Sequence, residues 1–214
     1  MEKYGITAAT FDKLAEKYQQ KYMDWDCYHD SYDAFLALLP SAEARILEPG
    51  CGPGNVSRYL LDRRPGLRIT GLDLAPAMVA LARANNPEAE FLVMDCRDIA
   101  ALPGPFDAIF CGFCLPYLSK PDAERLINDA KDLLAPGGLL YLSTMEDDDR
   151  RSGFQSNGDG DRVYIHYHQG EHLSRALTDN GFDVLDLWRQ AFPVEQGQPG
   201  TDLFILARAH EREK

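Results

Sequence analysis

The chain has 214 residues, of which 45% are hydrophobic and 26% charged, as is ordinary for one folded domain with a sizeable core. The formal net charge of −12 disfavours nucleic acid as a partner, because an acidic surface repels phosphates. No apolar run approaches the roughly 18 residues of a membrane span. Since the first residues also lack a signal peptide's apolar segment, we expect a cytoplasmic protein without a membrane partner. The five cysteines, odd in number and irregularly spaced, are expected to be reduced thiols.

The first 40 residues are expected to form a helical lid. Apolar residues recur at helical spacing over 10–21 and again over 32–39, and Tyr22, Trp25 and Tyr28 lie between the two stretches. One interpretation is a cap that covers the edge of a sheet, and the other is a lid whose aromatic side chains close over a ligand. The two are compatible, and both stay open here.

Residues 44–145 alternate strands with helices. The stretch 46–54 reads I-L-E-P-G-C-G-P-G, an apolar strand that enters a turn with glycine at every second position. Further strands are predicted over 67–74, 89–95, 106–113 and 139–145, with helices over 55–64, 76–86 and 119–135 between them. This order predicts an α/β fold with a doubly wound, mostly parallel sheet and helices on both faces.

The pattern changes after residue 145. Residues 146–161 are acidic and glycine-rich and are expected to form a long exposed loop, and 163–168 alternates like an edge strand. A helix over 171–180 precedes two strands over 182–191 and 202–209, which are expected to pair antiparallel. The turn between these strands contains Pro193, Gly197, Pro199 and Gly200. No linker separates two domains, so we predict one domain with a lid (1–40), a cofactor core (44–145) and a substrate-side segment (146–214).

Three carboxylates end successive predicted strands, namely Glu48, Asp73 and Asp95. Ligands of an open parallel sheet bind outside the carboxyl ends of its strands, so these side chains can converge on one crevice. Asp73 lies about 20 residues beyond the glycine turn, where a carboxylate accepts hydrogen bonds from a ribose diol. The turn lacks the third glycine of G-x-G-x-x-G, because the sixth position from Gly50 is Asn55.

Four motifs in order resemble the class I S-adenosylmethionine-dependent methyltransferases: E-P-G-C-G-P-G at 48–54, L-D-L at 72–74, M-D-C at 94–96 and L-L-A-P-G-G-L-L at 133–140. The resemblance covers 44–145 and implies a seven-stranded sheet whose last strand inserts antiparallel. It also implies S-adenosylmethionine as cofactor and methyl transfer to a small-molecule acceptor, with oxygen favoured as the accepting atom. The place where amide or base methyltransferases carry N-P-P-Y reads C-G-F-C-L-P-Y here, which disfavours nucleic-acid bases.

The same resemblance implies roles for individual residues. Gly50, Cys51 and Gly52 would pass the methionine part of the cofactor, and Glu48 would order this turn. Asp73 would hold the ribose hydroxyls, and Asp95 the adenine amino group. The remaining implied cofactor contacts are Leu74 and Met78 at the adenine, Cys96 and Arg97 beside it, Cys111 near the acceptor, and the lid tyrosines Tyr18 and Tyr22.

The acceptor side is less defined. His166 and His168 are either two exposed edge histidines or, with Tyr117, candidates for lining the acceptor pocket as a base. The C-x-x-C spacing at 111–114 and the calcium-like stretch at 157–162 lack the remaining ligands of a metal site, so no metal is expected. Two other functions stay open: a nicotinamide-dependent oxidoreductase on a similar sheet, and a cofactor-binding module without catalysis. The sequence does not indicate an oligomeric state.

Overall fold

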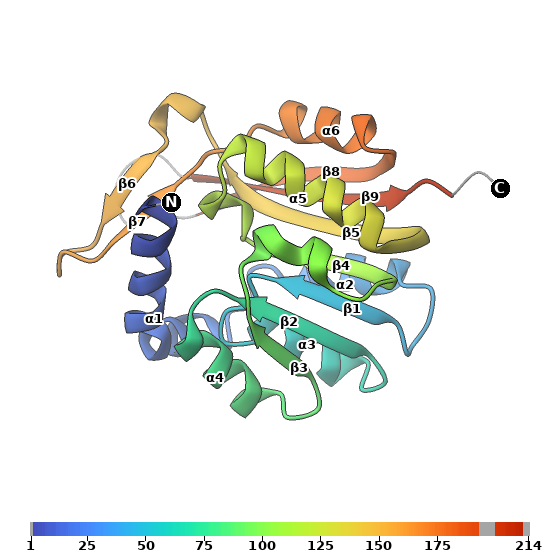
Figure 1. Cartoon of the computed structure of the whole chain (residues 1–214), viewed down its shortest axis with the longest axis horizontal. Helices are drawn as coiled ribbons and strands as arrows, with labels where there is room; N and C mark the ends of the chain where they lie inside the picture. The colour runs from blue at the N-terminus through green and yellow to red at the C-terminus, as the bar shows by residue number, and fades with distance from the viewer. Residues whose placement is uncertain (1, 193–199, 212–214) are drawn as a thin grey trace.

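The computed structural model describes residues 2–192 and 200–211, and a seven-stranded sheet forms its centre (Figure 1). The strand order is β3-β2-β1-β4-β5-β9-β8. The strands are β1 (Arg45–Pro49), β2 (Arg68–Asp73), β3 (Glu90–Val93), β4 (Phe106–Cys111), β5 (Leu134–Glu146), β8 (Phe182–Phe192) and β9 (Gly200–Ala209). The strands β1 to β5 run parallel, and β9 pairs antiparallel with both β5 and β8. The predicted doubly wound, mostly parallel sheet is confirmed.

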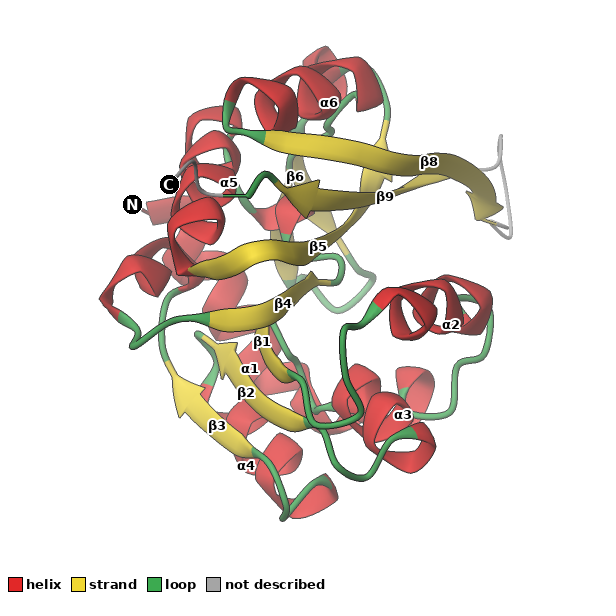
Figure 2. Cartoon of the chain, turned by 90° about the vertical axis from the view of Figure 1, so that its right-hand side faces the viewer, coloured by secondary structure: helices red, strands yellow, loops and turns green. Residues whose placement is uncertain are grey.

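Helices cover both faces of this sheet (Figure 2). They are α1 (Glu2–Tyr22), α2 (His29–Leu38), α3 (Asn55–Arg63), α4 (Pro76–Asn85), α5 (Lys120–Leu133) and α6 (Gly170–Asp179), with short 3₁₀ turns η1 (Cys96–Ala101), η2 (Leu115–Tyr117) and η3 (Asp149–Arg151). Successive strand residues point to opposite faces. Ile46 therefore packs in the cluster under α2 and α3, whereas Leu47 packs in the cluster under α5 and α6. Among the described residues, no helix is long and apolar enough to cross a membrane.

The first helix is longer than the sequence pattern indicated, since it begins at Glu2 rather than at residue 10. It lies beside α4 and against the strand β7 (Arg162–Ile165), at the carboxyl ends of the parallel strands (Figure 1). Thr7 and Thr10 bond the backbone of β7 through their hydroxyls. This placement puts the inner face of α1 over the crevice at which the glycine turn and the strand-end carboxylates meet.

The prediction of one long loop over 146–161 is wrong. Residues Gly153–Ser156 form the strand β6, which pairs antiparallel with β7 in a two-stranded arm. The side chain of Asn157 closes the arm by accepting hydrogen bonds from the amides of Asp159 and Asp161. Lys13 of α1 pairs with Asp161 at 2.6 Å, so the arm also contacts the first helix. Of the predicted turn after β8, Pro193, Gly197 and Pro199 lie outside the described residues.

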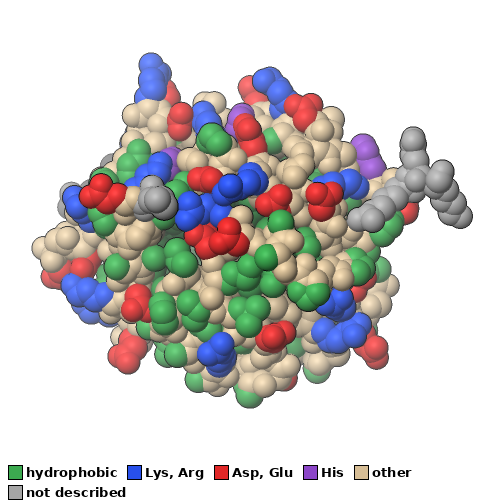
Figure 3. Space-filling view, viewed as in Figure 1, with side chains coloured by type: hydrophobic (Ala, Val, Ile, Leu, Met, Phe, Trp, Pro, Cys, Tyr) green, Lys and Arg blue, Asp and Glu red, His purple; other side chains and the backbone are tan. Residues whose placement is uncertain are grey.

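The surface of the chain is uneven in character. On the face viewed in Figure 1, hydrophobic side chains gather over the lower half, where α4 and β3 lie, and charged side chains of both signs mix over the upper half (Figure 3). Two of the exposed large hydrophobic residues are Leu74, which follows β2, and Val93, which ends β3.

Candidate functional site

The turn between β1 and α3 can be made only with glycine at two of its positions. Gly50 and Gly54 have φ angles of +73° and +79°, a region that L-residues rarely adopt. A Cβ at Gly50 would lie 2.9 Å from the Cβ of Cys114, and one at Gly54 would lie 2.4 Å from Nδ2 of Asn86. The bare backbone therefore lets the chain turn tightly beneath the crevice and leaves room for a ligand there.

Asp73, at the end of β2, is held in place by backbone donors. Its Oδ2 accepts the Gly52 N–H at 3.0 Å, and its Oδ1 accepts the Ala75 N–H at 2.8 Å. Burial raises the pKa of this carboxyl, against the effect of those two hydrogen bonds. The side chain faces a cavity of about 120 Å³. Its position follows from the strand end and the glycine turn alone, which is why the sequence could predict it.

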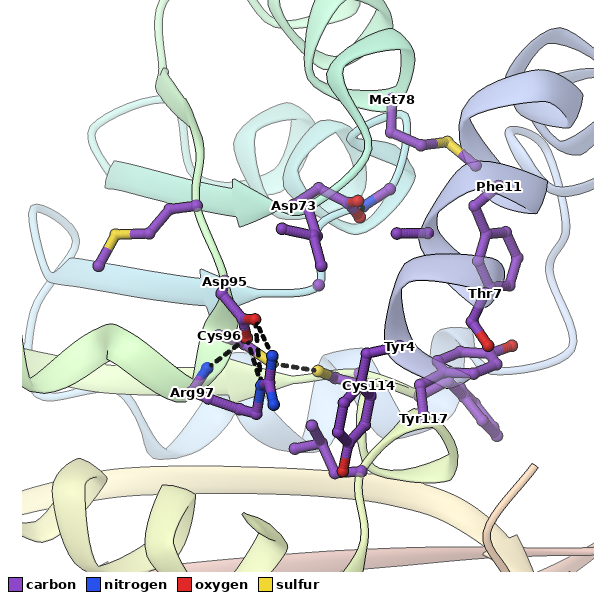
Figure 4. Close-up of a pocket in the computed structure, with 18 of the residues that line it drawn as sticks. Tyr4, Thr7, Phe11, Asp73, Met78, Asp95, Cys96, Arg97, Cys114 and Tyr117 are labelled. Atoms are coloured by element: carbon purple, nitrogen blue, oxygen red, sulfur yellow. Dashed lines mark hydrogen bonds and ion pairs between the residues drawn. The ribbon is translucent and has the colours of Figure 1, made fainter. Parts of the chain in front are cut away.

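Asp95 follows β3 and caps η1, where its side chain accepts the Arg97 N–H at 2.9 Å (Figure 4). Nε of Arg97 also lies 3.0 Å from both carboxylate oxygens. Burial acts to raise the pKa of Asp95, but the hydrogen bonds and charge of Arg97 outweigh it and lower the pKa. The guanidinium in turn lies 4.2 Å from the ring centre of Tyr4. Asp95 is therefore ionised, and part of its hydrogen-bonding capacity is already taken by Arg97.

Glu48, in β1, is a buried carboxyl that accepts a hydrogen bond from the hydroxyl of Ser57. Burial raises its pKa to about 8, so it is mostly protonated at neutral pH. It lines a second and larger cavity of about 770 Å³. The wall of the second cavity is therefore mostly uncharged at Glu48.

Helix α1 lines the first cavity from another side, through residues that include Tyr4, Thr7 and Phe11 (Figure 4). Lower on the same helix, the rings of Tyr18 and Tyr22 lie 4.5 Å apart between centres. The two cavities join at a set of shared wall residues, namely Tyr18, Gly50, Gly52, Gly112, Phe113 and Tyr117.

The structure brings nearly all the predicted cofactor residues to these cavities. Tyr18, Gly50, Gly52, Asp73, Leu74, Met78, Asp95, Cys96 and Arg97 line the first cavity, and Tyr22, Glu48 and Cys51 line the second. Cys111 lines neither: its side chain is fully buried and packs in the core under α5. This prediction is wrong because β4 runs as far as Cys111, and alternation along the strand turns that side chain inward.

Cys114 occupies the place that was predicted for Cys111. It lines the first cavity, and its Sγ lies 3.5 Å from the Sγ of Cys96, which lines the same cavity (Figure 4). All five cysteines are free thiols. Within residues 2–192 and 200–211, no group of three or more His, Cys, Asp or Glu residues has the arrangement of a metal site.

Of the three catalytic candidates, only Tyr117 lines the cavities, and it lines both. The expectation of two exposed edge histidines is wrong, because β7 ends at Ile165 and both side chains are buried. His168 Nε2 lies 2.9 Å from the carbonyl of Leu115, and His166 Nε2 lies 3.0 Å from Nζ of Lys3. Burial and the charge of Lys3 lower the pKa of His166 to about 4. Both histidines thus join the lid and its neighbours to the body of the domain.

Much of the second cavity was missed by the sequence analysis. Its far end is built from the segment after α1, the ends of β5 and β9, and the arm, through Trp25, Tyr28, Glu146, Arg151, Tyr167 and Asp202. The aromatic content of the segment after α1 was a usable signal. No sequence pattern indicated that Asp202 would line this cavity, because its partner Tyr28 is 174 positions away in the sequence.

Comparison with known proteins agrees with this geometry. Residues 46–138 match the family model described as a methyltransferase domain. The chain is 34% identical over 142 residues to malonyl-[acyl-carrier protein] O-methyltransferase of Enterobacter lignolyticus, which covers 66% of this chain and 54% of the relative. It is 39% identical over 119 residues to ubiquinone biosynthesis O-methyltransferase of Xanthomonas campestris. This alignment covers 53% of this chain and 47% of the relative. The chain thus spans about half the length of these curated relatives.

Among solved structures, the chain superposes on the DhpI–SAH complex with a TM-score of 0.72 and 20% identity, covering 98% of both chains. This superposition shows a shared fold and nothing beyond it, because the sequence identity is low. The match extends over the lid, the sheet and the antiparallel strand pair, whereas the family model covers only the central part of the chain.

Proposed function

We propose that this chain, which belongs to the class I S-adenosylmethionine-dependent methyltransferase family, transfers a methyl group from S-adenosylmethionine to an oxygen atom of a small-molecule acceptor. The observation that carries the proposal is the Asp73 carboxylate, fixed by two backbone amides beside the glycine turn and directed at a cavity. A carboxylate in this place accepts hydrogen bonds from a ribose diol and repels a phosphate.

The residues present fit this cofactor. Asp73 suits the ribose, and the pair of Asp95 and Arg97 with Leu74 and Met78 forms a partly apolar wall for a purine. The glycine backbone at the junction of the cavities allows close approach by an extended chain. Aromatic rings of the lid, Tyr18 and Tyr22 in particular, present faces that attract a cation such as a sulfonium.

The chemistry of the junction points to catalysis by positioning. When bound, the cofactor supplies a methyl group that is already activated by the positive sulfur. Of the residues shared by the two cavities, none is a His, Asp or Glu among those described. Burial raises the pKa values of Tyr18 and Tyr117, so both phenols stay neutral and serve as hydrogen-bond donors rather than bases. The chain therefore excludes water and holds the acceptor oxygen in line, and the acceptor has to be one that ionises readily.

The first test is calorimetric titration of the protein with S-adenosylmethionine and, separately, with NADH. We expect binding of the methyl donor, weakened about 100-fold by Asp73→Ala, since hydrogen bonds to a charged group contribute about 1.5–3 kcal/mol each. Asp98→Ala is the matched control, because Asp98 is exposed and lies outside both cavities. Binding of NADH alone, or equal loss in both variants, would overturn the proposal.

A second readout separates catalysis from mere binding. In the presence of an acceptor, the protein should produce S-adenosylhomocysteine at a rate that depends on the acceptor concentration. Cofactor binding without turnover on a broad panel of phenols, alcohols and carboxylic acids would instead support a cofactor-binding module.

A further inference from the structure

We propose that the acceptor is a small molecule bearing a protonated amine, and that this ammonium group lies against Asp202 among aromatic rings at the far end of the second cavity. The inference rests on the proposed function, because it takes the second cavity as the acceptor site. The amine is held there as a cation and serves for recognition, so the methylated atom is the oxygen of the proposed reaction.

Carboxyl groups outnumber basic side chains in the wall of the second cavity. Four carboxyl groups line it, those of Glu48, Glu146, Asp147 and Asp202, and Arg151 is the single basic residue among the described lining residues. Such a wall disfavours acceptors that carry a carboxylate, phosphate or sulfate group, because like charges at short range raise the cost of binding. It favours acceptors that are neutral or positive.

Three of the four carboxyl groups are already accounted for. Glu146 accepts hydrogen bonds from Arg189, and Asp147 pairs with Arg151. Glu48 is mostly protonated at neutral pH, since burial raises its pKa to about 8. None of these three groups therefore needs a cation from a ligand.

Asp202 differs from the others. This residue lies near the start of β9 and is only 4% exposed. Its carboxylate accepts a hydrogen bond from Tyr28 Oη at 2.7 Å. Among the described residues, no Lys, Arg or His forms an ion pair with it. Burial raises the pKa of the Asp202 carboxyl and the hydrogen bond from Tyr28 opposes this, so a nearby cation would favour its ionised form. A ligand ammonium in the cavity would supply the missing opposite charge.

Aromatic rings line the same cavity as this carboxylate, and one of them, Tyr28, bonds it directly. The ring of Tyr28 lies 4.9 Å from that of Phe113, and the ring of Trp25 lies 6.5 Å from that of Phe192, between centres. All four residues line the second cavity. Stacked or tilted rings around a carboxylate are the arrangement that holds ammonium ions, through the negative faces of the rings together with an opposite charge.

The backbone at Phe113 supports a role for its ring in this wall. Phe113 has a φ angle of +49° and is the non-glycine residue with positive φ among those described. Such a conformation is strained and persists where the surroundings fix it. Here the Phe113 N–H donates to Oγ of Ser143 at 2.9 Å, which holds the ring at the junction of the two cavities.

The test uses three phenols of matched shape: tyramine, which is cationic, 4-ethylphenol, which is neutral, and 3-(4-hydroxyphenyl)propionate, which is anionic. Each is titrated by calorimetry into wild-type protein saturated with S-adenosylhomocysteine. We expect tyramine to bind at least tenfold more tightly than 4-ethylphenol, and the anionic phenol to bind most weakly. Equal affinities, a preference for the anion, or no binding by any of the three would overturn the inference.

Two variants then locate the charge. Asp202→Asn keeps the size of the side chain and its contact with Tyr28, and should reduce tyramine binding at least tenfold while leaving 4-ethylphenol binding unchanged. Asp159→Asn removes an exposed carboxylate outside the cavities and should change neither. Equal loss of both phenols in Asp202→Asn would mean a structural role and would contradict the inference.

The two proposals fail in different ways. If S-adenosylhomocysteine binds and the cationic phenol shows no preference, the substrate class is wrong and methyl transfer still stands. If neither S-adenosylhomocysteine nor S-adenosylmethionine binds, the proposed function itself is wrong.

Discussion

The two cavities of this domain are built in different ways. The wall of the first is made by the glycine turn, the carboxyl ends of β2 and β3 and the segment after β4, with α1 as its cover. The far end of the second combines the segment after α1, the ends of β5 and β9, and the arm of β6 and β7. Sequence motifs supply much of the wall of the first cavity. The far end of the second cavity is formed by segments that only the tertiary structure brings together.

This difference coincides with the limits of the family match. The matched region, 46–138, contains Asp73, Asp95 and the whole glycine turn. Trp25 and Tyr28 precede this region, and Glu146 and Asp202 follow it. The relatives therefore inform the cofactor side of the site, and the chemistry of the acceptor has to be inferred from this chain's own side chains.

The largest expected effect comes from Gly50→Ala, at the junction of the two cavities. The new methyl group would meet Cys114 at 2.9 Å, and the residue would have to keep a φ angle of +73°. A left-handed conformation alone costs an L-residue about 1–2 kcal/mol. We expect cofactor affinity to fall at least 100-fold, measured by calorimetric titration with S-adenosylmethionine.

Gly158→Ala provides the comparison for that variant. A Cβ at Gly158 would have no atom within 4 Å, because this glycine lies in the turn of the arm. Its cofactor affinity should equal that of the wild type. If Gly50→Ala also bound the cofactor normally, the glycine turn would not border the ligand and the assignment of the first cavity would be wrong.

The second prediction concerns the pH dependence that Glu48 gives to stability. Its folded pKa, about 8, lies above the ordinary value of 4.5, so the unfolded chain loses this proton first as pH rises. Between these values the free energy of unfolding should fall by about 1.4 kcal/mol per pH unit on account of this group. Above about pH 8 the loss is complete, and below about pH 4.5 it is absent.

Glu48→Gln isolates this contribution, because it preserves an acceptor for Ser57 and removes the titrating proton. Urea unfolding of the cofactor-free protein from pH 5 to pH 8 is the measurement. The advantage of the variant over the wild type should grow with pH. Parallel curves for the two proteins would show that the carboxyl is already ionised in the folded state.

The fold and the cofactor side were predictable from the sequence because they depend on local patterns. Apolar strands, glycine turns and strand-end carboxylates occur in order, and a parallel sheet necessarily gathers its strand ends at one edge. Asp73 illustrates this, since it accepts hydrogen bonds from the amides of Gly52 in the glycine turn and of Ala75 just beyond the strand. The antiparallel insertion of β9 came from the resemblance to a family rather than from spacing.

Two of the failures share a physical cause. The strand β6 belongs to an arm that contacts α1, and no local pattern encodes that contact. His168 is buried against backbone carbonyls of a distant segment. Cys111 differs, because its burial follows from alternation along β4, which is a local pattern. Where a residue's environment is set by partners over 50 positions away, sequence spacing gives no guide to its exposure.

The smallest expected effect tests the far end of the second cavity through Tyr28→Phe. This change removes the hydroxyl that donates to Asp202 and leaves a buried carboxylate without its partner. The free energy of unfolding should fall by about 1–2 kcal/mol, measured by urea denaturation. Tyr164→Phe is the control, because the Tyr164 hydroxyl has no hydrogen-bond partner among the described residues, and it should shift stability by less than about 0.5 kcal/mol.

The same variant sharpens the contrast between structure and recognition at Asp202. Because Tyr28→Phe keeps the negative charge and the aromatic ring, it should retain the preference for tyramine over 4-ethylphenol, although its stability is lower. Loss of that preference would mean that the Tyr28 hydroxyl, and not the carboxylate, distinguishes the acceptors. The oxygen of Tyr28 would then accept a hydrogen bond from the acceptor directly, and the cavity would be selecting for a hydrogen-bond donor instead of a positive charge.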